Sequence, residues 1–88
     1  MAGGVEFVIH CFWRSVDPKH NRYRWYSLET SRDLWGHGCI ICCWGRLGRQ
    51  GGRRIEWYAS AEQREKIISR IQRTRSRHGY EPTPGFMP

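Results

Sequence analysis

Hydrophobic and polar residues alternate along the first third of the chain with the period of two that is typical of β-strands. Residues 5–13 are rich in β-branched and aromatic side chains, and a turn-forming segment follows at residues 15–21. Residues 22–28 alternate most clearly, with Tyr23, Trp25 and Ser27 on one face and Arg24, Tyr26 and Leu28 on the other. The pattern predicts two strands joined by a loop.

Two further strands are expected in the middle of the chain. Residues 33–38 predict a turn, and residues 39–44 form a nearly continuous apolar run, as expected for a central strand covered on both faces. A glycine-rich segment separates this run from a fourth strand at residues 53–59. Because the connections are short, we expect a twisted antiparallel meander of four strands.

The last third of the chain predicts one long helix. Ser60 followed by Gln63 is a capping-box pattern, so the helix should begin at Ala61 and run to about His78, where Gly79 supplies the stop. Residues 81–88 contain proline and glycine and are expected to form a flexible C-terminal tail.

The expected fold class is α+β, with the helix packed on the sheet. A chain of 88 residues leaves room for one small core, and five tryptophans, four tyrosines and three phenylalanines supply its apolar area. We therefore predict a single domain over residues 1–80, with its core at about residues 5–80.

Positive charge gathers in the second half of the chain. The net charge is +7. Residues 1–43 carry five basic against four acidic residues, whereas residues 44–80 carry ten against three. Thirteen of the fifteen basic residues are arginine, which favours bidentate recognition of phosphate or stacking on bases. Binding to a membrane surface or an acidic protein remains an alternative.

The predicted helix carries part of this charge. Ile67, Ile68 and Ile71 share one sector and predict the face that docks on the sheet. A basic stripe lies on a different side and comprises Lys66, Arg70, Arg73 and Arg77. An isolated stripe of this kind is more often a solvated helix face, but the basic loop in the same half of the chain favours a binding surface.

The loop sequence from residue 44 to 54 is Trp-Gly-Arg-Leu-Gly-Arg-Gln-Gly-Gly-Arg-Arg, a composition for which packing gives no reason. Glycine lets backbone N–H groups approach a phosphate, arginine matches phosphate oxygens, and tryptophan offers a flat face to a base or sugar. We predict a nucleic-acid contact surface that includes Trp44, Gly45, Arg46, Arg49, Arg53 and Arg54.

Structural explanations exist for the same residues. Trp44 could be a core aromatic that closes the sheet edge. Gly45, Gly48, Gly51 and Gly52 are expected in a hairpin connection with positive φ, whether or not the loop binds phosphate.

These residues resemble the WGR domain family, which is found in DNA-dependent poly(ADP-ribose) polymerases and in small bacterial proteins. Trp44-Gly45-Arg46 matches the motif that names the family. The resemblance spans roughly residues 10–80. It includes Tyr26 in the preceding strand, Gly48 and Gly51 after the motif, an aromatic strand around Trp57, Ser60 at the helix start and a closing Gly79-Tyr80. Departures are Gly52, where the family often has glutamine, and Arg77-His78, where a lysine is common nearby.

The resemblance implies a DNA-binding module without enzymatic activity. It assigns to Trp44 stacking on a terminal base or ribose, and to Arg46 a phosphate contact or a contact with the adjacent helix, on the tight chain path that Gly45 permits. Binding should be weakly sequence-specific, and the protein should be a monomer. The alternative is a protein-interaction adaptor that docks on a catalytic partner, because WGR domains in multidomain enzymes also contact neighbouring domains.

Catalysis, metals and cofactors are not indicated by the remaining residues. Cys39 and Cys42 have the spacing of metal ligands, but in an extended strand they point to opposite faces, so we expect small buried hydrophobes. Neither a nucleophile motif nor clustered carboxylates are present, and the four histidines lack a paired spacing. ADP-ribosyl transfer in the family belongs to a separate and larger domain.

The expected location is inside the cell, in the cytoplasm or the nucleoid if the source is bacterial. Three cysteines crowd into one strand, which favours reduced thiols. No secretory pattern or apolar run of membrane-spanning length is visible.

Overall fold

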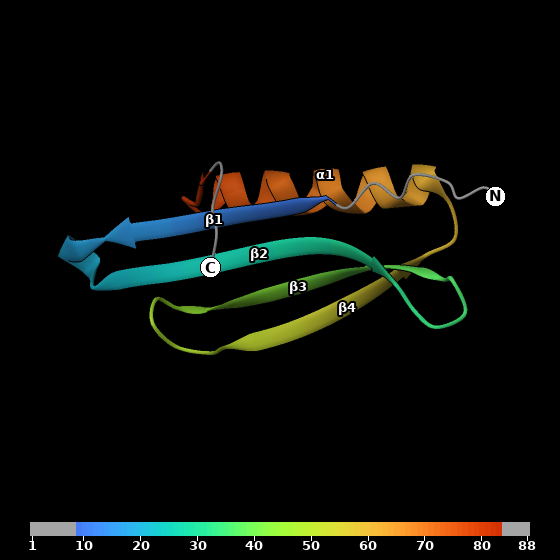
Figure 1. Cartoon of the computed structure of the whole chain (residues 1–88). Coiled ribbons are helices and arrows are strands. Elements are labelled where there is room, and N and C mark those ends of the chain that lie inside the picture. The colour runs from blue at the N-terminus through green and yellow to red at the C-terminus, as the bar shows by residue number, and fades with distance from the viewer. Residues whose placement is uncertain (1–8, 84–88) are drawn as a thin grey trace.

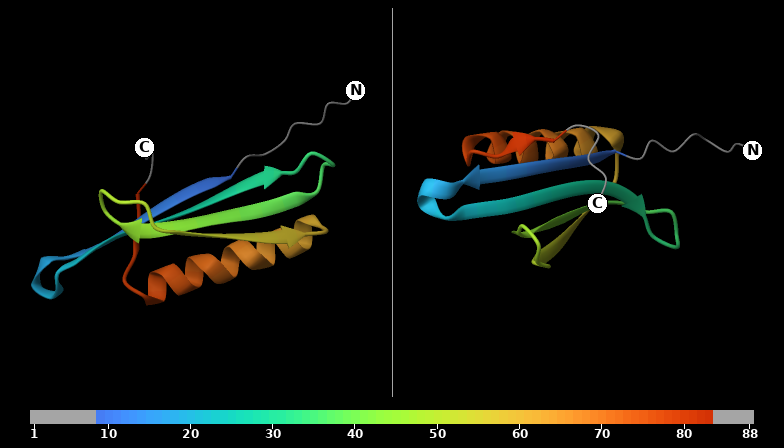
Figure 2. Two further views of the ribbon diagram at one scale, coloured as in Figure 1. Left: turned by 90° about the horizontal axis from the view of Figure 1, so that it is seen from below. Right: turned by 60° about the vertical axis from the view of Figure 1, so that its left-hand side comes forward.

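Residues 9–83 are described by the computed structural model, which has an antiparallel sheet with a helix across one face (Figures 1 and 2). In chain order the elements are β1 (His10–Asp17), the 3₁₀ turn η1 (Pro18–His20), β2 (Arg22–Arg32), β3 (Gly38–Arg46), β4 (Gly52–Tyr58), α1 (Ala61–Arg77) and β5 (Glu81–Pro82). The strand order is β4-β3-β2-β1-β5, which confirms the predicted meander and the α+β class.

A fifth strand is the main difference from the four that the sequence predicts. Glu81 and Pro82, which we expected in the tail, pair with Arg14 and Trp13 on the free edge of β1. The N–H of Thr83 also donates to the carbonyl of Phe12 at 2.8 Å. A two-residue strand is too short to leave an alternating pattern. The rest of the predicted tail, residues 84–88, and the first part of the predicted first strand, residues 5–8, lie outside the described residues.

The first two strands are longer than the sequence pattern indicates. Their pairing continues to Asp17 opposite Arg22, through residues 15–17 where we expected the loop. The reversal is confined to η1 and Asn21, whose φ of 51° lies in the left-handed region that asparagine tolerates. At its other end β2 continues to Arg32 instead of ending at Leu28. Cross-strand hydrogen bonds therefore extend these strands beyond their apolar alternation.

The pairing register decides which side chains reach the core. Trp13, Leu28, Ile40 and Cys42 form one buried cluster with two helix residues, Ile68 and Ile71. This cluster confirms the predicted docking face of the helix.

The other face of the sheet is not covered by a second layer within residues 9–83, whereas we expected β3 to be covered on both faces. Phe12 stacks on Trp25 there, with ring centroids 6.2 Å apart. Ile55 and Trp57 are exposed on this open face.

Both ends of α1 follow the sequence prediction. Ser60 Oγ accepts a hydrogen bond from the Gln63 N–H at 3.1 Å, while Gln63 Oε1 accepts from the Ala59 N–H at 2.6 Å. The helix ends at Arg77, and Gly79 follows with a φ of 79° that glycine adopts readily.

Candidate nucleic-acid interface

Trp44, Gly45 and Arg46 are the last residues of β3, and the turn that follows them is tied to β2. The Leu47 N–H donates to the Tyr23 carbonyl at 2.8 Å, and the indole N–H of Trp25 donates to the carbonyls of Arg46 at 3.1 Å and Arg49 at 3.2 Å. This turn and the turn between β1 and β2 lie at the same end of the sheet (Figure 1). The motif is thus presented on a constrained turn.

Three of the four glycines at this turn are required by packing, contrary to our expectation. A Cβ at Gly51 would lie 1.8 Å from the Trp44 carbonyl oxygen, and one at Gly52 would lie 2.3 Å from Cζ2 of the Trp44 indole. Of the four glycines that we expected to have positive φ, only Gly48 does, at 84°. Close approach of two chain segments, rather than a left-handed backbone, explains Gly45, Gly51 and Gly52.

Trp44 lies on the helix side of the sheet and is partly covered. Its ring stacks on that of Tyr26, with centroids 6.1 Å apart and planes inclined by 15°. The residue retains 37% exposure. It therefore has both a packing role and a surface available to a ligand.

Arg75 extends this aromatic row from the helix. Its Cζ lies 4.0 Å from the ring centroid of Tyr26 and 4.9 Å from that of Tyr80. Contacts with two rings hold the guanidinium over the sheet. Burial raises the pKa of Tyr26 above its ordinary range, and a hydrogen bond with Cys42 raises it further.

Aromatic and cationic side chains surround a cleft of about 400 Å³ beside Trp44. The residues that line this motif cleft include Arg24, Arg46, Arg54, Arg75, Tyr26, Trp44 and Tyr80, and none of its lining residues is acidic. Such a surface suits stacking on a base or sugar together with contacts to phosphate.

A second cleft of about 660 Å³ adjoins the first at the C-terminal end of α1. This hairpin cleft is lined mainly by Arg22, Arg24, Arg75, Arg77, His78 and Tyr80. It shares Arg24, Arg75 and Tyr80 with the motif cleft, so the two form one continuous basic surface.

Sequence reasoning missed three arginines of this surface: Arg22, Arg24 and Arg75. The alternation of the second strand does place Arg24 on the face of Tyr26. Arg75 lies four residues after Ile71, at the spacing of the helix face that docks on the sheet. Arg24 and Arg75 could therefore have been predicted from the sequence as residues of this surface.

Arg46 is held by the β1–β2 turn. Its guanidinium donates to Oδ1 of Asn21 at 3.2 Å and to the Asn21 carbonyl at 3.4 Å, and its Cζ lies 5.4 Å from the ring centroid of Tyr23. These contacts fix the orientation of a side chain that also lines the motif cleft.

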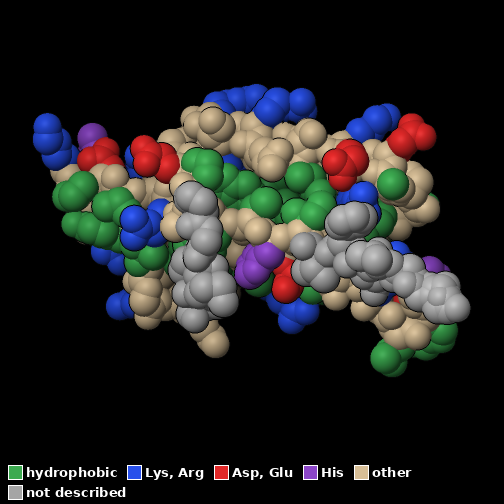
Figure 3. All heavy atoms as spheres, turned by 45° about the horizontal axis from the view of Figure 1, so that its top comes forward, with side chains coloured by type: hydrophobic (Ala, Val, Ile, Leu, Met, Phe, Trp, Pro, Cys, Tyr) green, Lys and Arg blue, Asp and Glu red, His purple; other side chains and the backbone are tan. Residues whose placement is uncertain are grey.

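The other predicted site residues are divided among several surfaces. Arg54 lines the motif cleft but is bonded to Oε1 of Glu56 at 2.5 Å, and Arg70 of α1 bonds the same oxygen. Arg49 is exposed on the turn, and Arg53 pairs with Cys43 on the open face. Lys66 and Arg73 line a separate hollow along α1 together with Arg70. Basic side chains cover the outer side of α1 (Figure 3), but of the predicted stripe only Arg77 lines the hairpin cleft.

The four cysteines are free thiols, and burial raises the pKa of Cys11, Cys39 and Cys42. Within residues 9–83, no group of three or more histidine, cysteine or acidic residues is placed to hold a metal ion. In the same part of the chain no helix has the length and apolar character needed to cross a membrane.

Comparison with known proteins identifies one family. The family model described as "WGR domain" matches residues 9–87. A curated relative, "Uncharacterized protein y4dW" of Sinorhizobium fredii, is 28% identical over 71 residues. The match covers 81% of this chain and 35% of the relative, so the chain spans about a third of that protein's length. No solved structure matches the chain.

Proposed function

The chain belongs to the WGR domain family, and we propose that it is a non-enzymatic module that binds DNA through the Trp-Gly-Arg turn and the motif cleft. The observation that carries the proposal is the composition of that cleft, in which four guanidiniums and three aromatic rings are gathered without an acidic side chain. Phosphates supply the opposite charge, and bases or sugars supply flat faces.

Each motif residue has a role in this proposal. The exposed part of Trp44 stacks on a terminal nucleotide. Arg46, which is oriented by its hydrogen bond to Asn21, binds a phosphate. Gly45 allows the close chain path, because a Cβ there would lie 3.1 Å from the Cα of Gly51. Arg49 is exposed on the same turn and adds a further phosphate contact in this proposal.

We place the interface on the helix side of the sheet, which narrows the set of residues expected from the sequence. Arg54 and Arg77 remain in it. Arg53, Lys66, Arg70 and Arg73 are left out, because they lie on the open face or along the hollow of α1. The module acts as a monomer inside the cell in this proposal.

The test is a titration of labelled DNA with the full chain. Blunt, nicked, recessed and single-stranded DNA of equal length are compared for the wild type and for the Trp44→Ala/Arg46→Ala double variant, with folding verified by circular dichroism. The matched control is Trp57→Ala/Arg53→Ala, which removes the same residue types from the open face. We expect binding that is selective for ends or nicks and is lost only in the first double variant.

The salt dependence of DNA affinity is a second test of the proposed function. Neutralising about four duplex phosphates gives a slope of log K against log salt near −3.6. Equal binding of all four DNAs by all three proteins would reduce the interaction to nonspecific charge attraction and would overturn the proposal.

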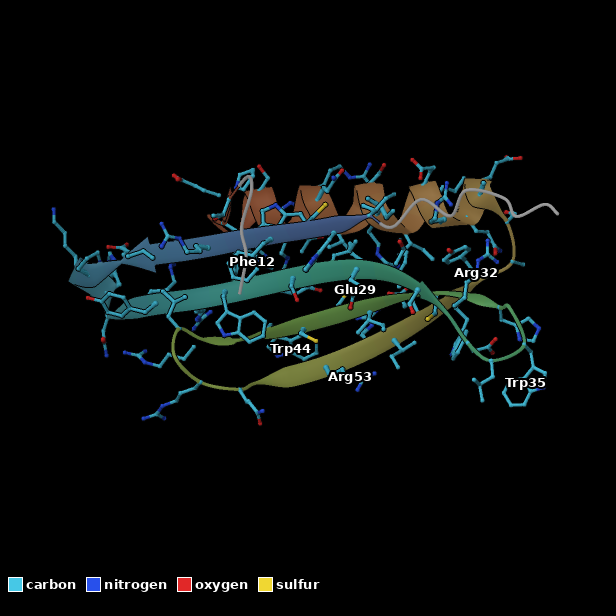
Figure 4. The ribbon with its side chains drawn as sticks, in the orientation of Figure 1. Phe12, Glu29, Arg32, Trp35, Trp44 and Arg53 are labelled. Atoms are coloured by element: carbon cyan, nitrogen blue, oxygen red, sulfur yellow. The ribbon has the colours of Figure 1, made fainter. Side chains whose placement is uncertain are left out.

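A protein-interaction adaptor is the second candidate, and the loop between β2 and β3 favours it. Leu34 is 94% exposed and Trp35 is 78% exposed at the tip of this loop (Figure 4). Asp33 orders the loop, because its Oδ1 accepts from the N–H groups of Trp35 at 2.9 Å and His37 at 2.8 Å. An exposed tryptophan on an ordered loop is a common anchor in protein interfaces. The adaptor predicts no selective DNA binding in the titration.

A further inference from the structure

Four arginines surround the hairpin cleft, where the turn between β1 and β2 meets the C-terminal end of α1. No residue that lines this cleft is acidic. The carboxylate of Asp17 lies at its border, with Oδ2 3.9 Å from Nη2 of Arg22, but the same oxygen is 2.7 Å from Nδ1 of His20. Like charges gathered around one cavity repel each other, and an anion between them relieves that repulsion.

Two of these arginines, Arg22 and Arg75, are partly buried. Arg75 lies over the rings of Tyr26 and Tyr80, and the Nε atoms of Arg22 and Arg75 are buried without a hydrogen-bond partner in the described part of the chain. Ser15 Oγ is a third buried atom of this kind. A Cβ at Gly79 would lie 3.5 Å from Nη2 of Arg22 and 4.0 Å from Ser15 Oγ, which places these groups at one junction.

The remaining two arginines are open to solvent. Arg24 projects from β2 and Arg77 from the last turn of α1, and both are exposed. An oxyanion in this cleft would be met by two partly buried arginines and two exposed ones. Charge-assisted hydrogen bonds of this kind are roughly twice as strong as neutral ones.

We propose that the hairpin cleft is a second phosphate site, which binds backbone phosphates of the nucleic acid beyond those held at Arg46. This inference rests on the proposed function and deepens it. The two clefts share Arg24, Arg75 and Tyr80, so a strand that contacts Trp44 and Arg46 continues along the same surface to the end of α1. The ligand chemistry is that of phosphate oxygens, and phosphodiesters of the backbone are the source to which the continuous surface points.

The first test measures the salt dependence of binding to a duplex without terminal phosphates. Arg24→Gln/Arg77→Gln is compared with the matched double variant Arg53→Gln/Arg73→Gln, which removes equal charge outside both clefts. If each of Arg24 and Arg77 neutralises one phosphate, the slope of log K against log salt falls in magnitude by about 1.8. We expect this fall in the first variant and an unchanged slope in the control. Equal changes in both would overturn the site, even if Trp44 and Arg46 prove essential.

The second test separates this inference from the proposed function. Inorganic pyrophosphate is titrated into the wild-type chain while the arginine Nε–H signals are followed by nuclear magnetic resonance. We expect the signals of Arg22, Arg24, Arg75 and Arg77 to shift while those of Arg53 and Arg73 do not. If this selective shift occurs and the protein does not bind DNA, the hairpin cleft is a site for free polyphosphates, and the proposed function fails. Uniform shifts, or none, would overturn the site.

Discussion

The indole of Trp44 lies directly against the backbone of Gly52, so closely that a Cβ at residue 52 would be 2.3 Å from Cζ2 of the ring. The two residues are partners across β3 and β4, and Tyr26 is the partner of Trp44 on the other side. The orientation of the motif tryptophan is therefore set by the absence of a side chain on one neighbouring strand and by an aromatic ring on the other. The contact gives a physical reason for glycine at residue 52 in this chain.

Replacing Gly52 with alanine should displace the Trp44 ring. Overpacking of this kind costs about 1–3 kcal/mol of unfolding free energy, and we expect DNA affinity to fall as well, because the exposed part of the indole moves. Urea unfolding and the DNA titration measure the two effects. Gln50→Ala on the same turn is the control and should change the free energy of unfolding by less than about 0.5 kcal/mol. A Gly52→Ala variant with unchanged stability and affinity would contradict this account.

Trp25→Phe should loosen the turn that carries the motif. The substitution keeps an aromatic ring beside Phe12 but removes the indole N–H that donates to the carbonyls of Arg46 and Arg49. We expect a loss of about 0.5–1.5 kcal/mol, and faster hydrogen exchange at residues 46–49. Trp57→Phe makes the same change on an exposed side chain and should leave that exchange unaltered. Equal exchange in both variants would show that Trp25 does not constrain the turn.

Glu56→Gln should weaken folding slightly and strengthen DNA binding. Oε1 of Glu56 accepts from both Arg54 and Arg70, so neutralising it releases Arg54 to the motif cleft. The loss of stability should be about 1 kcal/mol or less, because both guanidiniums are largely exposed. The salt slope of DNA binding should steepen by about 0.9 if Arg54 gains one phosphate.

Net charge alone would also raise the affinity, and Glu29→Gln controls for it. Glu29 is exposed on β2, opposite Ile41, and its loss changes the total charge by the same amount outside the clefts. A steeper slope in Glu56→Gln than in Glu29→Gln is the expected result. Identical slopes would mean that Arg54 takes no part in binding.

Three thiols that are partly or fully buried should react slowly in the native protein. Burial raises the pKa of Cys11, Cys39 and Cys42, so the reactive thiolate is scarce near neutral pH. We expect iodoacetamide to modify these residues at pH 7.5 much more slowly in the folded protein than in urea, as measured by mass spectrometry. Comparable rates in the two states would contradict the buried placement.

The same shifts predict a loss of stability at alkaline pH. An acid whose pKa is raised by folding contributes its full stability below its unfolded pKa, which is about 8.5 for a thiol, and loses it as pH rises through the folded value. The urea midpoint should therefore be lower at pH 9.5 than at pH 7.5. A Cys42→Ala variant should show a smaller pH dependence, although its midpoint at pH 7.5 is itself lowered by the lost packing.

Local patterns predicted the elements well but their ends less well. Ser60 and Gln63 predicted the start of α1 because capping depends on a few consecutive residues. β1 and β2 run past their predicted ends because pairing between strands, rather than alternation, stabilises residues 15–17 and 29–32. β5 exists only because the chain returns after α1 to the free edge of β1.

The candidate site, too, could be predicted only in part from the sequence. The motif and its glycine-rich turn were visible in the sequence, since their chemistry is concentrated in eleven consecutive residues. The opposite sides taken by Arg53 and Arg54 follow from strand alternation, but which of them faces the clefts depends on where the helix lies. The basic stripe appeared uniform on a helical projection, yet Arg70 bonds Glu56 on β4 while Arg77 lines the hairpin cleft.

The family, the order of the four main strands and the helix, and the basic, aromatic chemistry of the motif could all be predicted from the sequence. These properties depend on residue type and on spacing over a few residues, and both can be read directly from the sequence. The tertiary structure was needed to show that Gly45, Gly51 and Gly52 serve close packing, that no second layer covers one face of the sheet within residues 9–83, and that Arg22, Arg24 and Arg75 join the motif residues on one surface. Those outcomes depend on pairing register and on the path of α1 across the sheet, because they bring together residues separated by some fifty positions in the chain.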